Sequence, residues 1–239
     1  MTLWTSNVVL TDRDIKLFCY LNEQKFMVSG QIYKIFWPES DPESGTARQR
    51  LTKLIESGYI KIMTVRDEKK KKDLKLFLLT VKGIEVLRTQ RLDHKFSELS
   101  DVNPVLVEHG LKLTNIRALF QELGQTNWQS ERLIRKEEAS RGWYPDGVLN
   151  VNGFKIAIEL ENSFRPKERY IGRFKRYRED KEFDLVIFIL SWPSVRSWLL
   201  DLDSPQDKIC FVDYDVLLKK KGDSELENKT SAITLRSIL

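Results

Sequence analysis

The chain has 239 residues, 41% of them hydrophobic, which is enough apolar material for one or two compact domains and excludes an intrinsically disordered chain. Its 40 basic and 35 acidic residues give a formal net charge of +5, so positive charge matters only where it is locally concentrated. Two distant cysteines exclude a disulfide framework, and no signal peptide or membrane-length apolar run is visible, so we expect a soluble cytoplasmic protein without membrane contact.

The first part of the chain is predicted to contain three helices, then a hairpin, then a fourth helix. Apolar residues at helical spacing follow residues that commonly cap helices, and two short strand-like runs flank a charged loop. The helices begin near Thr11, Ser29, Thr46 and Thr80, and the strands cover residues 59–65 and 74–80. This order is typical of a winged helix-turn-helix, which we place at residues 1–92.

The third helix has the composition of a DNA-reading helix. At about 100° per residue, Ala47, Leu51 and Leu54 fall on one apolar stripe that would pack inward. Polar residues lie opposite or beside this stripe, and arginine can pair with guanine and glutamine with adenine. The candidate DNA-contacting residues of this helix are Thr46, Arg48, Gln49, Arg50, Thr52 and Lys53.

The loop between the two strands supplies a second group of candidate contacts. It carries the consecutive lysines Lys69, Lys70, Lys71 and Lys72. These lysines suit electrostatic contact with phosphates, which adds affinity rather than sequence reading; the alternative is a solvated hairpin tip. Together, the run from Ala47 to Tyr59 and the segment from Leu79 to Gly83 resemble bacterial winged-helix regulators. The resemblance implies binding to double-stranded DNA, and paired half-sites would suit a homodimer.

A polar stretch at residues 93–105 is predicted to link this domain to a second one at residues 106–239. Helical and strand-like segments alternate in the second domain, which predicts an α/β arrangement with a mixed central sheet. Asn152-Gly153 is a strong two-residue hairpin signal. Strands are expected at residues 148–151, 154–161, 183–190 and 209–212, and helices at residues 114–123 and 166–179.

Acidic residues gather around the predicted hairpin. Period-two geometry puts Glu159 and Glu161 on the same face of their strand. If Asp146 lies at the neighbouring strand, three carboxylates converge, an environment that suits magnesium or manganese and metal-assisted phosphodiester hydrolysis. The alternative is that both glutamates lie on the solvent face of an edge strand and Asp146 caps a turn.

The arrangement resembles the PD-(D/E)XK nuclease-like fold, whose pattern is Pro-Asp, a hairpin and an acidic residue two positions before a lysine. Asp146 and Glu159 match, but Glu161 occupies the lysine position, so the positive charge that steadies the attacked phosphate is missing there. The resemblance implies that Lys167, from the next helix, can replace it as a catalytic residue. It also implies that Glu131 joins Asp146, Glu159 and Glu161 as a metal ligand.

The helix that carries Lys167 is strongly basic. We expect its Arg169 and Arg173 to contact nucleic-acid phosphates beside the carboxylates. The alternative is an ordinary solubilising helix face with alternating charges.

The winged helix together with residues 128–131, 145–147 and 159–170 resembles the replication-relaxation family of plasmid and mobile-element proteins. The implied fold class is α+β, with an N-terminal winged helix-turn-helix and a nuclease-like α/β domain. The leading hypothesis is a double-stranded DNA-binding regulator of replication, transfer or transcription, with a degenerate nuclease-like domain and no cofactor requirement for binding. The rival is a magnesium- or manganese-dependent endonuclease, and a third hypothesis is a protein-interaction module.

Overall fold

The computed structural model describes residues 8–39, 45–67, 71–93, 96–139, 142–202 and 208–239. The chain divides into two compact units, Met1–Thr114 and Asn115–Leu239. The division lies inside helix α5 (Pro104–Glu122), whereas the polar composition of residues 93–105 predicts a linker there.

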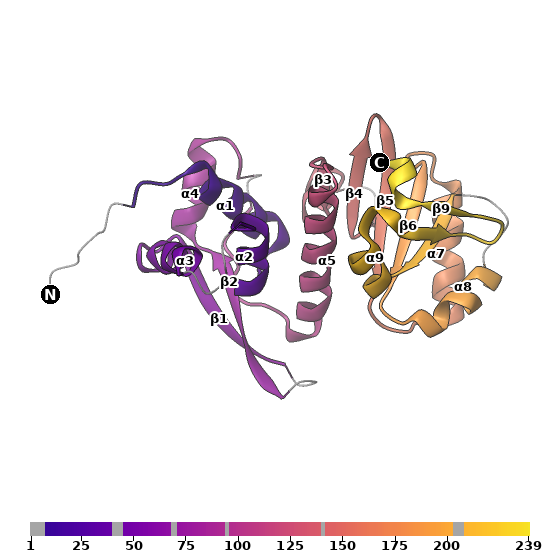
Figure 1. Cartoon of the computed structure of the whole chain (residues 1–239), viewed down its shortest axis with the longest axis horizontal. Helices are drawn as coiled ribbons and strands as arrows, with labels where there is room; N and C mark the ends of the chain where they lie inside the picture. Colours follow the sequence, from indigo (N-terminus) through magenta and orange to yellow (C-terminus); the bar gives the residue numbers. More distant parts are fainter. Residues whose placement is uncertain (1–7, 40–44, 68–70, 94–95, 140–141, 203–207) are drawn as a thin grey trace, which may run out of the picture. The chain divides into compact units, whose positions relative to one another are not determined.

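The first unit combines helices α1 to α4 with the antiparallel hairpin β1–β2 (Figure 1). Its elements are α1 (Asp12–Gln24), α2 (Ser29–Phe36), α3 (Thr46–Glu56), β1 (Ile60–Asp67), β2 (Lys72–Leu79) and α4 (Val81–Thr89). Thr11 caps α1 through a reciprocal pair of hydrogen bonds with Asp14, and Thr80 caps α4. The predicted order of helices and strands is therefore confirmed.

The apolar faces of these helices meet in one core. Leu17 and Leu21 of α1, Ile32 of α2 and Leu54 of α3 are almost completely buried there. The spacing of these residues follows the helical period, so each helix buries one stripe and leaves the opposite face to solvent.

The hairpin β1–β2 extends beyond the helices of its unit (Figure 1). Its register pairs Ile60 with Leu79 at the base and Asp67 with Lys72 at the far end. The residues of β2 nearest the base are buried, whereas Lys71, Lys72 and Asp73 are exposed. The hairpin thus presents its charged end to solvent.

A second apolar cluster lies in the first unit, and it includes part of the stretch predicted as a linker, residues 93–105. Val102 packs there with Phe26 and Leu78. Helix α5 approaches this cluster closely at Gly110, because a Cβ at that position would lie 2.8 Å from Phe26 Cζ.

The second unit is built on a mixed sheet with the strand order β3-β4-β5-β6-β7-β8-β9. Strands β5, β6 and β7 run parallel, and their other neighbours pair antiparallel. The strands are β3 (Trp128–Ser130), β4 (Gly147–Val151), β5 (Phe154–Glu161), β6 (Leu185–Leu190), β7 (Ile209–Asp213), β8 (Glu225–Glu227) and β9 (Ala232–Thr234). The mixed α+β class and the mixed central sheet are as predicted.

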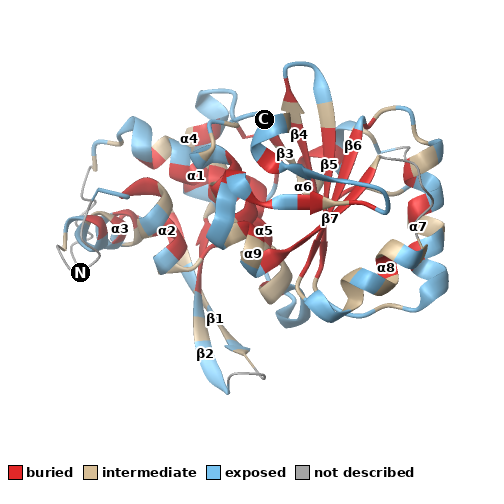
Figure 2. Ribbon diagram, turned by 45° about the vertical axis from the view of Figure 1, so that its right-hand side comes forward, coloured by how far each residue is buried: buried red, intermediate tan, exposed pale blue. Residues whose placement is uncertain are grey.

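Helices cover both faces of this sheet, so β5, β6 and β7 are buried on both sides (Figure 2). The helices of this unit are α6 (Glu131–Glu137), α7 (Lys167–Glu179), α8 (Arg196–Leu202) and α9 (Tyr214–Lys220), with the C-terminal part of α5. Tyr170, Phe174 and Tyr177 of α7 pack on one face with Phe188 and Phe211. Figure 1 shows α9 and the C-terminal part of α5 on the opposite side of the sheet from α7.

In the part of the chain that the structure describes, no helix combines the length and the apolar character that crossing a membrane requires.

Candidate nucleic-acid interface and carboxylate site

Helix α3 separates its apolar and polar residues as its sequence predicts. Ala47, Leu51 and Leu54 are buried in the core of the first unit. The residues exposed to solvent on this helix include Thr46, Arg48, Gln49, Thr52 and Lys53. This set contains all but one of the candidate DNA contacts on α3, and it leaves their donors and acceptors open to a ligand.

Arg50 is the exception, because its guanidinium lies against α1. Nε donates to Asp14 Oδ1 at 3.0 Å, and Nη2 donates to the carbonyl oxygen of Val9 at 2.8 Å and also contacts Asp14 Oδ2. Burial would raise the pKa of the Asp14 carboxyl, but hydrogen bonds from Arg50 and Thr11 outweigh it and lower that pKa. Arg50 therefore ties α3 to α1 and is occupied within the unit.

The loop lysines fall into two groups. Lys71 and Lys72 are exposed at the far end of the hairpin, whereas Lys69 and Lys70 lie outside the described residues. Nearby, Arg66 and Asp73 form an exposed ion pair across the two strands with 3.3 Å between Nη1 and Oδ1. The described lysines retain the accessible positive charge that the sequence predicts.

In the second unit, Glu159 and Glu161 lie on an internal strand rather than on an edge. Strand β5 is hydrogen-bonded to β4 on one side and β6 on the other, and α7 covers the face that carries both glutamates. The two side chains are 3% and 4% exposed. The alternative of a solvent-facing edge strand is therefore wrong, because it assumed that only one face of β5 was covered.

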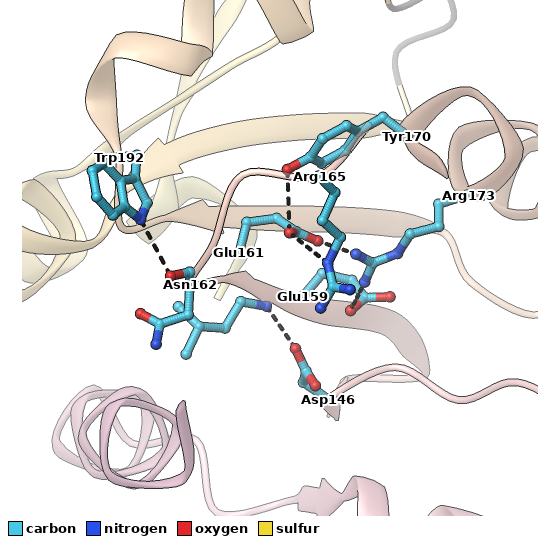
Figure 3. A network of polar contacts seen from close by, with 9 residues as sticks. Asp146, Glu159, Glu161, Asn162, Arg165, Tyr170, Arg173 and Trp192 are labelled. Carbon is cyan, nitrogen blue, oxygen red and sulfur yellow. Dashed lines mark hydrogen bonds and ion pairs between the residues drawn. The ribbon is translucent and has the colours of Figure 1, made fainter. Parts of the chain in front are cut away.

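Arg173 of α7 joins the two buried carboxylates. Its guanidinium uses Nη2 to bind Glu159 and Nη1 to bind Glu161 (Figure 3). Glu161 also accepts a hydrogen bond from the Tyr170 hydroxyl at 3.3 Å and lies 3.5 Å from Arg165 Nε. Glu159 accepts a further hydrogen bond from the Tyr177 hydroxyl. The carboxylate oxygens are thus surrounded by donors from one helix and the loop before it.

Burial dominates the electrostatics of this network. It raises the pKa of Glu159 to about 7, with repulsion from Asp146 adding to burial and Arg173 opposing both. Burial would lower the pKa of Arg173, but Glu159 and Glu161 outweigh it and raise that pKa. Burial and the charge of Glu161 raise the pKa of Tyr170 to about 12. Burial and the charge of Glu159 likewise raise the pKa of Tyr177. Arg173 and both tyrosines therefore keep their protons as donors at neutral pH.

Asp146 and Glu131 lie close to this network but serve other contacts. Asp146 Oδ2 accepts a hydrogen bond from the backbone N–H of Leu160 at 2.8 Å, which fixes it beside β5 (Figure 3). The backbone N–H of Glu131 donates to the carbonyl oxygen of Asp146 at 3.1 Å. The side chain of Glu131, however, pairs with Arg135 one turn along α6.

The residues near these carboxylates do not fit the magnesium or manganese ion that the nuclease-like resemblance implies. The cation that contacts Glu159 and Glu161 is Arg173, and Lys167 is exposed without an ion pair to a described carboxylate. Among the described residues, no group of three or more His, Cys, Asp or Glu side chains is arranged to hold a metal ion. A guanidinium therefore neutralises the charge that a divalent metal would otherwise balance.

A pocket of about 160 Å³ adjoins the network. Its lining residues are Trp143, Tyr144, Glu159, Arg173, Arg176 and Tyr177. Arg176 is exposed, while the Trp143 and Tyr177 rings meet edge to face with centroids 4.9 Å apart. Sequence reasoning named Arg173 only as a phosphate contact and missed both tyrosines. The available signal was the seven-residue spacing of Tyr170 and Tyr177, which places them on one side of α7.

These observations define a two-unit α+β protein: a helical first unit with an exposed basic helix and a second unit with a mixed sheet and a neutralised carboxylate site. The model of a family described as replication-relaxation matches residues 18–181, well over half of the chain. The chain belongs to the replication-relaxation family. No curated protein matches it, and no solved structure matches it.

Proposed function

We propose that this protein binds double-stranded DNA through its first unit and serves the replication or relaxation of a plasmid or mobile element. The observation that carries the proposal is the exposed face of α3, which presents Arg48, Gln49 and Lys53 to solvent while the apolar face is buried. The order of α1 to α3, β1–β2 and α4 supports a winged helix-turn-helix, in which α3 would enter the major groove. Family membership supports the biological role.

Within this proposal, the candidate contacts divide by task. Arg48 and Gln49 have the donors and acceptors for base edges, and Thr46, Thr52 and Lys53 flank them. Lys71 and Lys72 would meet phosphates beside the groove. Arg50 is assigned to support of α3, since its Nε and Nη2 already donate to Asp14 and to the carbonyl oxygen of Val9.

The test is selection and binding of random-sequence duplex DNA by the full chain. Arg48→Ala/Gln49→Ala/Lys53→Ala should weaken binding of the selected duplex by about tenfold or more, because each good base contact contributes about 1–3 kcal/mol of discrimination. Lys16→Ala/Arg91→Ala removes the same number of positive charges from exposed positions elsewhere in the unit and should bind normally. Equal affinity of the triple variant and the wild type for every duplex would overturn the proposal.

We further propose that the second unit is a nuclease-like domain that does not cut DNA. Its support is Arg173, which pairs with both Glu159 and Glu161, and the finding that no group of three or more His, Cys, Asp or Glu side chains among the described residues is arranged to hold a metal ion. Plasmid DNA incubated with the protein and magnesium or manganese should stay intact. Metal-dependent cutting that Asp146→Ala abolishes would overturn this part and leave the duplex-binding proposal standing.

A further inference from the structure

Two exposed aromatic rings lie at the carboxyl ends of neighbouring parallel strands in the second unit. Phe164 follows β5 and is 64% exposed, and Trp192 follows β6 and is 53% exposed. Glu161 and Leu190, the last residues of these strands, are register partners. Ligands of open α/β sheets commonly bind outside this end of the strands.

Both rings are held in place rather than free to collapse onto the surface. The Trp192 indole N–H donates to the carbonyl oxygen of Asn162 at 3.2 Å, which links the two loops (Figure 3). The Phe164 ring packs against the Trp198 ring in a tilted arrangement, with 5.6 Å between the ring centroids. A ring that is already ordered loses little conformational freedom when a flat ligand stacks on it.

Unpaired positive charge lies beside the rings. Lys167 and Arg169, in the first turn of α7, are exposed and make no ion pair with any described residue. Helix α7 carries six basic and two acidic residues, a net charge of +4 in a chain whose total is +5. Of its exposed cations, Lys167 and Arg169 lie in the first turn, directly after the loop that carries Phe164.

We propose that Phe164, Trp192, Lys167 and Arg169 form a platform for single-stranded DNA. Bases would stack on the two rings, and the phosphates would lie against the two cations, which is the combination that sequence-tolerant single-strand binding uses. The choice of DNA rests on the proposed function, whereas the platform itself lies in the other unit and uses none of the α3 residues.

The experiment measures binding of a short labelled oligo(dT) to the full chain by fluorescence anisotropy. Phe164→Leu/Trp192→Leu keeps apolar side chains but removes the aromatic faces, and it should weaken binding by about tenfold or more. Phe154→Leu is the matched control, since Phe154 is an exposed aromatic residue at the opposite end of β5, and it should bind as the wild type does. Trp192→Phe with Phe164 intact should retain most of the affinity.

The charged half of the platform has its own control pair. Arg169→Ala should weaken oligo(dT) binding and reduce its dependence on salt, whereas Lys175→Ala, which removes an exposed charge paired with Glu179 on the same helix, should change little. Thermal unfolding of each variant checks that the fold is kept.

Failure of the platform and failure of duplex recognition give different results. The Phe164/Trp192 variant should bind the selected duplex normally, and the α3 triple variant should bind oligo(dT) normally. Unchanged oligo(dT) affinity in the Phe164/Trp192 variant would overturn the platform. If sedimentation also showed a self-association that this variant loses, the surface would belong instead to a second copy of the chain.

Discussion

Arg173 is the residue on which the carboxylate site of the second unit depends. Replacing it with alanine would leave the buried Glu159 without a cation and Glu161 with Arg165 alone, and breaking a buried ion pair typically costs about 3–5 kcal/mol. We expect Arg173→Ala to lower the free energy of unfolding by this amount in urea at neutral pH. Four of the six tryptophans lie in the second unit, so tryptophan fluorescence mainly reports its unfolding.

Lys175→Ala is the control for this substitution, because it removes an exposed cation from the same helix and should change stability by no more than about 0.5 kcal/mol. Adding Glu159→Gln and Glu161→Gln to Arg173→Ala should recover part of the loss, since the neutral amides need no cation. If Arg173→Ala unfolded at the same urea concentration as Lys175→Ala, the ion pairs would not stabilise the unit.

Glu159 should make stability depend on pH in a direction opposite to that of most carboxylates. Its folded-state pKa of about 7 lies above the ordinary value of 4.5, so the folded chain binds this proton more tightly than the unfolded chain. The resulting stabilisation is complete below pH 4.5 and is lost as pH rises towards and through 7. Glu159→Gln should flatten the free energy of unfolding across this range, and Glu179→Gln, which removes an exposed carboxyl group from α7, is the matched control.

At the scale of elements, two glycines of the second unit differ in whether the surrounding atoms leave room for a side chain. Gly172 lies within α7, and no atom is within 4 Å of the position a Cβ would take. Gly172→Ala should therefore stabilise the helix by about 0.5–1 kcal/mol, because alanine has the higher helix propensity.

At Gly147 a Cβ would fall 2.2 Å from Trp128 Cζ2, and Gly147→Ala should destabilise the unit by about 1–3 kcal/mol. Thermal unfolding of the two variants should shift in opposite directions; a shift in the same direction would contradict this account.

The elements that sequence reasoning predicted well are those specified by local chemistry. Asn152 and Gly153 both have positive φ, 52° and 87°, as the Asn-Gly signal requires, and the hairpin β4–β5 forms around them. The first half of α5 was missed because Val105 and Leu106 are exposed, so its apolar residues give no clean helical stripe.

The carboxylate site was predicted only in part because its decisive contacts are long-range. The alternation of β5 correctly put Glu159 and Glu161 on one face, but their burial depends on β6 and α7, which follow later in the chain. The sequence alone shows that Glu161 stands where the nuclease-like pattern has a lysine. It does not show that Arg173 contacts both glutamates, because a basic residue on an amphipathic helix gives the same local pattern whether it faces solvent or a strand.

At the scale of the whole molecule, two of the places where positive charge is concentrated lie in different units of the chain. The first is α3 with the hairpin end, and the second is α7, whose net charge nearly equals that of the entire chain. A net charge of only +5 is therefore compatible with two basic surfaces suited to phosphates, each in a different unit.

Two such surfaces on one chain predict a preference for DNA that contains both duplex and single strand. When the first unit binds the duplex arm of a fork, the second unit meets the single strand at an effective concentration far above that in bulk solution. We expect the protein to bind the fork at least about tenfold more tightly than it binds a duplex of the same sequence without the single strand.

The measurement is anisotropy competition between the two DNAs at fixed salt, since affinity for either falls as salt rises. Phe164→Leu/Trp192→Leu should reduce fork affinity to that of the plain duplex, whereas Phe154→Leu should not. Equal affinity of the wild type for fork and duplex would contradict simultaneous engagement of the two units, because a linked second contact must add affinity whenever both sites are filled.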